Sequence, residues 1–205
     1  MRNGLSMRVF GNGVIGGMAL IGVLLAPAAP GAQSRSVQDT TRSVKRALER
    51  LPYYGVFDYM AFGVDSGTVT LTGYTYNGGL RSAAERATKK ASGVDEVANR
   101  LEVLPPSPFD DRIRWATFYE IYTDSSLSRY APGGVTGTLR EAFEARTLPG
   151  LQPLGAYPIH IIVKNGRTTL AGVVDSHADR QIAEARAREV SGVFNVNNEL
   201  TVRNY

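Results

Sequence analysis

The sequence contains no cysteine and only two histidines among its 205 residues. The absence of cysteine excludes a disulfide scaffold, a thiolate zinc site, a cysteine nucleophile and a lipidated N-terminal cysteine. The two histidines, His160 and His177, do not lie in a cluster with metal-ligand spacing, so no metal site is predicted. With 43% hydrophobic and 20% charged residues the chain can still bury a core, which excludes wholesale disorder.

Long apolar runs are also scarce, and the longest lies near the N-terminus. Val14–Leu25 would span about 18 Å as a helix, well short of the roughly 30 Å of a bilayer core. Arg2 and Arg8 precede this run, and small residues follow it up to Ala32. This order predicts a cleavable signal peptide over residues 1–32, with an uncleaved anchor as the alternative. An exported chain without cysteine fits a bacterial periplasm.

The net charge of +4 depends partly on this N-terminal segment. Residues 1–32 hold two of the 23 Lys and Arg residues and none of the 19 Asp and Glu residues. The remaining chain therefore carries a net charge of only +2. Such a weak basic balance does not indicate a nucleic-acid-binding protein.

The rest of the chain contains an internal repeat. A shift of 99 residues places Val64–Val103 over Val163–Val202 without a gap, and 15 of the 40 pairs are identical. The identical positions are mainly glycines and aliphatic residues, which is typical of a shared scaffold. We therefore predict two copies of one small domain.

Each copy is predicted to run strand, turn, strand, helix, strand. Asn165-Gly166 in the second copy is a strong hairpin signal, and Gly93-Val94 and Gly192-Val193 are typical of Schellman helix ends. Gly73 and Gly172 fall within strands, which predicts a bulge or a close backbone approach by a helix. The expected strands are 57–64, 68–74 and 97–104 in the first copy and 159–163, 168–174 and 196–202 in the second.

A further helix is expected upstream of each copy. In the first copy an apolar stripe lies opposite a basic face formed by Arg42, Lys45, Arg46 and Arg50. In the second copy the helix is expected over residues 111–127, although a capping box at Thr138–Glu141 offers an alternative first helix. The copies are joined by a Pro-rich linker at 105–108, and an insertion at 131–157 separates helix from strand in the second copy.

These motifs resemble the BON domain, a family named for an osmotically induced periplasmic protein and nodulation proteins. The resemblance rests on Gly67–Gly73 and Gly166–Gly172, each followed by a Gly-Val-x-x-Val-x-Asn-x-Leu-x-Val segment at 93–103 and 192–202. It implies an α+β fold of two tandem αββαβ units, each with a three-stranded mixed sheet on two helices. We place the units at 37–104 and 109–203. Thr168, where the pattern has valine, and the insertion depart from it.

Two groups of residues are candidate contacts with a lipid surface. Trp115 lies beside Arg112 and Arg114, a combination that suits the headgroup region of a membrane. Alternatively, Trp115 forms a core stripe with Phe118, Tyr119 and Tyr122 at helical spacing. The basic face of Arg42, Lys45, Arg46 and Arg50 is the second group, with an ordinary solvated helix face as its alternative.

The resemblance implies no catalytic residues, and the residues themselves form no enzyme constellation, so no enzyme activity, cofactor or metal is expected. It implies envelope proteins that bind or lie near phospholipid. We therefore expect a non-catalytic periplasmic protein that binds anionic phospholipid at a membrane surface and supports envelope integrity. The alternative is a protein-interaction or chaperone-like module for envelope proteins, acting through the 131–157 insertion and a tyrosine-rich surface.

Overall fold

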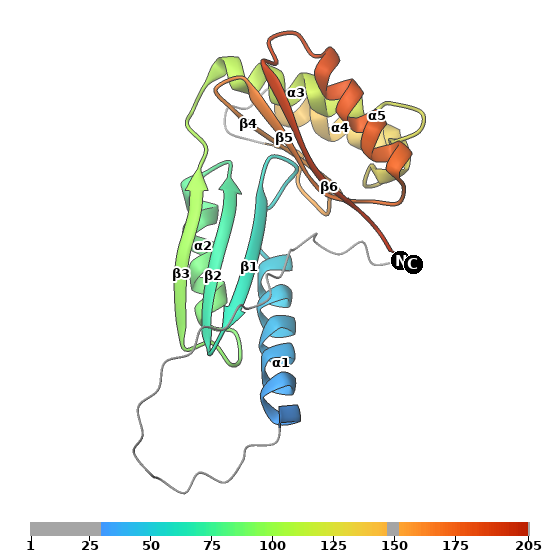
Figure 1. The fold of residues 1–205 in the computed structure, drawn as a ribbon. Helices are drawn as coiled ribbons and strands as arrows, with labels where there is room; N and C mark the ends of the chain where they lie inside the picture. Colours follow the sequence, from blue (N-terminus) through green and yellow to red (C-terminus); the bar gives the residue numbers. More distant parts are fainter. Residues whose placement is uncertain (1–29, 147–151, 205) are drawn as a thin grey trace, which may run out of the picture.

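The computed structural model describes residues 30–146 and 152–204 as two units, each with a three-stranded sheet (Figure 1). Residues 1–29 of the predicted signal peptide lie outside the described residues. Within the described part, every helix is too short or too polar to cross a membrane. The predicted α+β class, with two mixed sheets, is confirmed.

The first unit runs α1 (Pro30–Glu49), β1 (Tyr59–Asp65), β2 (Thr68–Thr75), α2 (Gly78–Lys89) and β3 (Glu96–Val103). Its strand order is β1-β2-β3, in which β1 and β2 are antiparallel and β2 and β3 are parallel. α1 and α2 contact each other and cover one face of this sheet. The core between helices and sheet contains Val44, Leu48, Phe62 and Leu71, all nearly inaccessible to solvent.

The second unit repeats this arrangement with an insertion. It runs α3 (Pro108–Tyr122), the 3₁₀ helix η1 (Ser128–Tyr130), α4 (Gly134–Arg146), β4 (Ile159–Lys164), β5 (Arg167–Val174), α5 (His177–Glu189) and β6 (Asn195–Val202). α3 contacts β4 and α5, just as α1 contacts β1 and α2, whereas α4 contacts α3 and η1. Of the two helices considered from the sequence, α3 therefore occupies the position of α1.

α3 differs in its bounds from the helix expected over residues 111–127. It begins at Pro108, because the Ser107 hydroxyl accepts a hydrogen bond from the Asp110 amide at 3.1 Å and caps the helix. It ends at Tyr122, where the chain turns towards η1. The last proline of the expected linker is thus the first residue of a helix, where proline is well tolerated.

A polar clamp fixes the second helix of each unit to the last strand. The Asn99 side-chain amide donates to the Arg81 carbonyl at 3.2 Å and to the Glu85 carboxylate at 3.1 Å. Arg81 in turn donates to the Leu101 carbonyl at 2.8 Å. The same clamp recurs in the second unit through Arg180, Glu184 and Asn198. Three of the repeated identities are thus explained by one hydrogen-bond network.

Gly73 and Gly172 are required because a neighbouring strand lies unusually close. Both have positive φ, +117° and +133°. A Cβ atom at Gly73 would lie 2.2 Å from the Tyr59 carbonyl oxygen, and one at Gly172 would lie 2.0 Å from that of Pro158. The expected close approach is therefore made by the preceding chain and not by a helix.

The two units are joined by a backbone segment of the first unit that lies between two segments of the second. The Val56 amide donates a hydrogen bond to the Pro153 carbonyl at 3.1 Å, and the Gly155 amide donates one to the Tyr54 carbonyl at 3.1 Å. On the other side, Ile161 of β4 donates to the Val56 carbonyl at 2.8 Å. The outer edge of β4 is therefore paired with the first unit, so it is not an open sheet edge there.

Side chains of the same segment complete the core of the second unit. Val56 and Phe57 are fully buried and belong to the core that contains Phe118 and Ile159. The Phe57 amide also donates to the Gln152 side chain at 2.7 Å. The expected strand over residues 57–64 was wrong at its start: β1 begins at Tyr59, because Phe57 is held by the second unit.

Buried ionisable groups accompany this junction. The Asp58 carboxylate accepts hydrogen bonds from the amides of Gly55 at 3.0 Å and Tyr76 at 2.6 Å, and from the Gln152 side chain. Burial outweighs these bonds and raises the pKa of Asp58 to about 7. His160, buried beside the Tyr54 hydroxyl at 3.4 Å, has a pKa lowered to about 4 by burial. The junction thus contains two groups whose charged forms are disfavoured.

Phe57→Ala is expected to destabilise the protein by about 3–5 kcal/mol, since it leaves a cavity in the core of the second unit. Tyr53→Ala on the same segment is the matched control, because Tyr53 is 65% exposed and its loss should cost less than about 1 kcal/mol. Urea unfolding followed by circular dichroism measures both. Equal destabilisation by the two substitutions would contradict the described packing of Phe57.

Asp58 and His160 are expected to give opposite pH dependences. A raised folded-state pKa of Asp58 makes stability fall as pH rises from about 4 to about 7, whereas the lowered pKa of His160 makes stability fall as pH drops from about 6.5 to about 4. On acidification from pH 6.5 to pH 4, Asp58→Asn should therefore lose more stability than the wild type, and His160→Gln should lose less. The difference is roughly 3 kcal/mol per group. Identical pH profiles of unfolding for the two variants would contradict this assignment.

Candidate functional site

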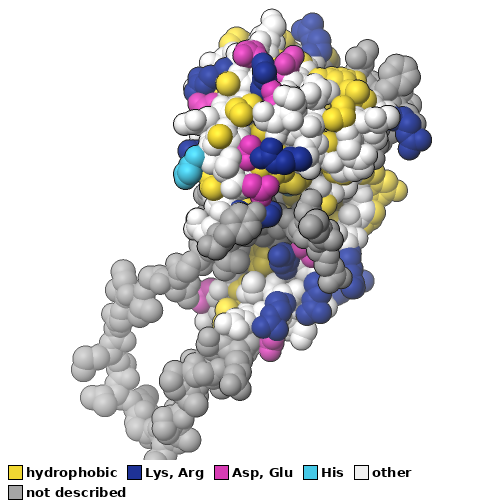
Figure 2. Space-filling model, turned by 90° about the vertical axis from the view of Figure 1, so that its right-hand side faces the viewer, with side chains coloured by type: hydrophobic (Ala, Val, Ile, Leu, Met, Phe, Trp, Pro, Cys, Tyr) yellow, Lys and Arg dark blue, Asp and Glu magenta, His cyan; other side chains and the backbone are white. Residues whose placement is uncertain are grey.

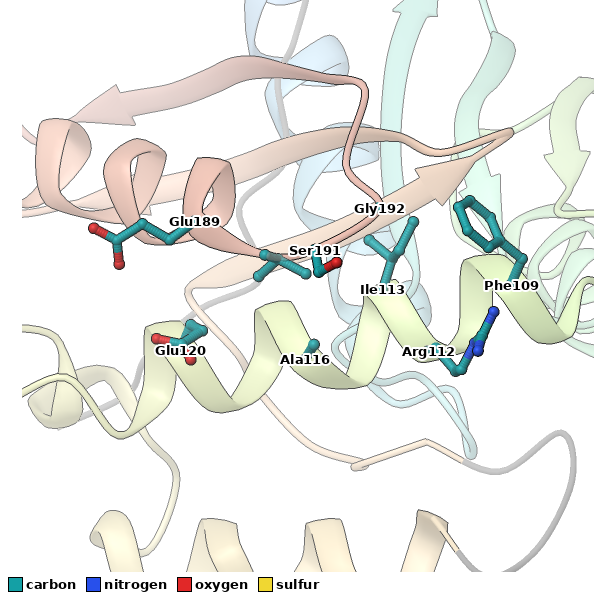
Figure 3. Close-up of a pocket in the computed structure, with 9 residues that line it drawn as sticks. Phe109, Arg112, Ile113, Ala116, Glu120, Glu189, Ser191 and Gly192 are labelled. Atoms are coloured by element: carbon teal, nitrogen blue, oxygen red, sulfur yellow. The ribbon is translucent and has the colours of Figure 1, made fainter.

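A groove of about 400 Å³ lies between α3 and the C-terminal end of α5 in the second unit (Figure 3). Its floor is apolar, with Ile113 nearly inaccessible to solvent. From α3 it is lined by Phe109, Arg112, Ile113, Ala116 and Glu120, and from the end of α5 by Glu189, Val190, Ser191 and Gly192. Apolar and charged side chains therefore line the same groove.

Two exposed aromatic rings stack at one end of the groove. The rings of Phe109 and Phe194 lie 6.0 Å apart at an angle of 29°, and the side chains are 38% and 74% exposed. Glycines make room for them: a Cβ atom at Gly192 would lie 3.2 Å from the Phe109 ring, and one at Gly166 would lie 2.5 Å from the Phe194 ring. Large apolar surface therefore remains in water at this point of the fold.

The first unit shows that the fold does not need these rings. Asp95 stands 99 residues before Phe194 and lies against Gly67, the counterpart of Gly166. Thr40 lies against Gly93 where Phe109 lies against Gly192. Two polar residues of the first unit are thus replaced by two exposed phenylalanines in the second. A difference of this kind between copies of one scaffold indicates function more than folding.

Charge is distributed unevenly along the groove. Arg112 is exposed, and its guanidinium lies 5.7 Å from the centre of the Phe109 ring. Figure 3 shows Arg112 and Phe109 at one end and Glu120 and Glu189 at the other. The aromatic end is therefore basic, and the opposite end is acidic.

Trp115, expected at a lipid surface or in a core stripe, lies at the junction of the two units. Its ring contacts those of Phe57 at 5.3 Å and Phe118 at 5.9 Å, both edge to face. It is half-buried and packs against the core of the second unit. Its apolar surface is therefore covered in part by Phe57 of the first unit and in part by Phe118 of its own helix.

Arg114 is fully buried, so its expected contact with a membrane surface is wrong. Its guanidinium forms an ion pair with Asp111 at 2.5 Å, donates to the Val163 carbonyl and lies 5.2 Å from the Tyr76 ring. Tyr76 also donates to Asp111 at 3.1 Å, and its burial raises the pKa of Tyr76 to about 12. Arg114 is a structural residue that links α3 to β4 and to the first unit.

The basic face of α1 is exposed as expected, but half of it is paired with acids. Arg42 forms an ion pair with Asp39 at 3.4 Å and Lys45 with Glu49 at 3.8 Å, while Arg46 and, directly after the end of α1, Arg50 are also exposed. Figure 2 shows lysine and arginine side chains gathered over the first unit. In Figure 1, α1 lies at the opposite end of the molecule from the turn between α5 and β6. The two candidate groups are therefore separate surfaces.

Sequence analysis missed Phe109 and Phe194, although the repeat contained a signal for one of them. Phe194 is an aromatic residue in a loop where the other copy has Asp95, directly after a glycine helix end. In the described ranges 30–146 and 152–204, no group of three or more His, Asp or Glu side chains is arranged to hold a metal ion.

Two of the solved structures to which this chain is similar are of a secretion-system protein, CdsD. The C-terminal domain of CdsD, the structural protein of the Type III secretion system of Chlamydia trachomatis, is 13% identical with a TM-score of 0.26, covering 81% of this chain and 98% of that one. A second CdsD structure is 11% identical with a TM-score of 0.26, covering 80% and 92%. Among curated proteins, no match is found.

The family comparison covers both units. The BON domain matches residues 36–105 and 136–204, which together are more than half of the chain. The second match begins within α4 and follows the chain from there, whereas in space α3 occupies the position of α1. The strands of both units, together with α2 of the first unit and α5 of the second, lie within the matched residues. The chain therefore belongs to the BON domain family, with two copies of the domain.

Proposed function

We propose that this protein is a non-catalytic binding module of the periplasmic envelope, and that its second unit contacts anionic phospholipid at a membrane surface. The observation that carries the proposal is the exposed pair of Phe109 and Phe194 beside Arg112. Aromatic rings next to a cation suit the boundary between headgroups and acyl chains, where the rings enter the apolar layer and the cation meets phosphate. Such contact supports envelope integrity without any chemical step.

The magnitude of this contact indicates a reversible association. Full transfer of a phenylalanine side chain from water contributes about 1.5–3 kcal/mol. With 74% and 38% of their surface exposed, Phe194 and Phe109 together contribute about 2–3 kcal/mol. One arginine near an anionic surface adds about 1 kcal/mol. The total corresponds to a dissociation constant of roughly 1 mM or weaker, which is peripheral binding.

The basic face of α1 is proposed as a second, weaker contact. Arg42 and Lys45 have acidic neighbours that reduce the local potential, so Arg46 and Arg50 supply most of its attraction. Because this face lies on the first unit, a membrane contact there is separable by mutation from that of the groove. Trp115 contributes to either contact only through the part of its ring that the first unit leaves accessible.

The alternative protein-interaction role relied on the 131–157 insertion. Gln152, Pro153 and Gly155 of this insertion are hydrogen-bonded to Tyr54–Phe57 within the molecule. That part of the insertion holds the two units together, so it is not a free surface for a partner. The arrangement therefore favours the lipid contact over the alternative.

The double substitution Phe109→Thr and Phe194→Asp gives the groove the residues of the first unit. It is expected to reduce sedimentation with phosphatidylglycerol-containing vesicles at least about tenfold, because the inserting rings are lost. Thermal stability should be nearly unchanged, since Thr40 and Asp95 occupy the equivalent positions of the first unit. Tyr53→Ala, which removes an exposed aromatic residue outside the groove, is the control and should leave sedimentation unchanged. Full vesicle binding by the double variant would overturn the proposal.

Arg112→Gln is expected to weaken binding to anionic vesicles about three- to tenfold and to leave the weak binding to neutral phosphatidylcholine vesicles unchanged. The matched control is Arg100→Gln, another exposed arginine, on β3 and away from the groove. A variant with Arg42, Lys45, Arg46 and Arg50 all changed to Gln measures the contribution of α1. If that variant loses binding while Arg112→Gln does not, the membrane contact belongs to α1 and not to the groove.

A further inference from the structure

One stripe along α3, formed by Arg112, Ala116 and Glu120, carries opposite charges placed symmetrically about its central residue. Arg112 precedes Ala116 by four residues, and Glu120 follows Ala116 by four residues. All three line the groove, and both charged residues are exposed. Within the described part of the chain neither Arg112 nor Glu120 has an ion-pair partner. The stripe therefore presents one free cation and one free anion at equal distances from a small residue.

This symmetry makes α3 complementary to a reversed copy of itself. Four helical residues correspond to about 6 Å along the axis, so a two-fold axis beside Ala116 would place Arg112 opposite Glu120 of the second copy, and the reverse. Glu189 lies beside Glu120 at the same end of the groove, but its carboxylate is ion-paired with Arg186 at 2.9 Å, so Glu120 is the carboxylate that meets Arg112 of the second copy. An alanine at the crossing point permits the two helices to approach closely.

We propose that two copies of the protein associate through antiparallel α3 helices, with Arg112 of each copy paired with Glu120 of the other. A second copy is favoured over other occupants because its charges match the groove at both ends at once. A membrane or a uniformly charged partner would match only one end. Burial of part of the exposed Phe109 ring near each end adds an apolar contribution.

The proposed pairing does not rest on the lipid contact, but the two associations compete for the same surface. Arg112 and Phe109 belong to both, so a paired molecule does not present them to a membrane. Glu120 belongs to the pairing alone, because an acidic residue does not attract an anionic surface. Substitution of Glu120 therefore distinguishes failure of the pairing from failure of the lipid contact.

The test is sedimentation velocity of protein expressed from the full-length sequence, at low salt and without lipid, from about 5 to about 200 µM. The wild type is expected to shift from monomer to dimer over this range. Arg112→Glu and Glu120→Arg each place like charges opposite one another at both contacts, so each alone should weaken dimerisation at least about tenfold. Arg100→Glu, an exposed charge reversal on β3, is the control and should dimerise like the wild type.

An equimolar mixture of the Arg112→Glu and Glu120→Arg variants provides the decisive measurement. One variant then carries two acids and the other two bases at these positions, so the mixed dimer regains both attractive contacts. The mixture should dimerise at least as well as the wild type, although neither variant does so alone. A wild type that stays monomeric at 200 µM, or a mixture that behaves like its separate components, would overturn the proposal. Circular dichroism of each variant confirms that these surface substitutions leave the fold intact.

Discussion

The position of Phe57 in the core of the second unit is the contact on which the rest of the structure depends. Its ring touches those of Trp115 and Phe118, and its amide is bonded to Gln152, so one residue of the first unit joins a helix and a loop of the second. Because core packing is dense, this contact fixes the relative placement of the units. The protein is therefore not two domains on a flexible linker, although its sequence is a tandem repeat.

This rigid junction gives the two copies different roles. The first unit contributes Val56 and Phe57 to the core of its neighbour, and it carries polar Thr40 and Asp95 where the second unit carries exposed phenylalanines. Two independent binding modules would gain affinity by acting together at one membrane. Here only the second copy presents the aromatic pair, and the first copy holds it in place through Val56 and Phe57.

Most of the scaffold could be predicted from the sequence because its signals are local. Hairpin glycines, helix caps and the 99-residue repeat located both sheets to within a few residues, since each depends on nearby backbone geometry. Phe57, Trp115 and Arg114 were harder to place because their partners lie in other elements, many of them far away in the chain. Arg114 illustrates the difficulty. A charged residue is expected at the surface, but Arg114 is buried because Asp111, one helical turn earlier, neutralises its charge.

The candidate site could not be predicted for a related reason: exposure of an aromatic residue is a property of the assembled fold. Phe109 follows a proline at a helix start and looks like an ordinary core residue, yet Gly192 holds its ring at the surface against Phe194. Leaving two such rings exposed to water forgoes a few kcal/mol of the stabilisation that their burial would give. In the first unit polar residues occupy the equivalent positions, so the fold itself does not require exposed phenylalanines there. In the two proposed associations these rings are covered, both of them by a membrane and Phe109 in part by a second copy of the chain.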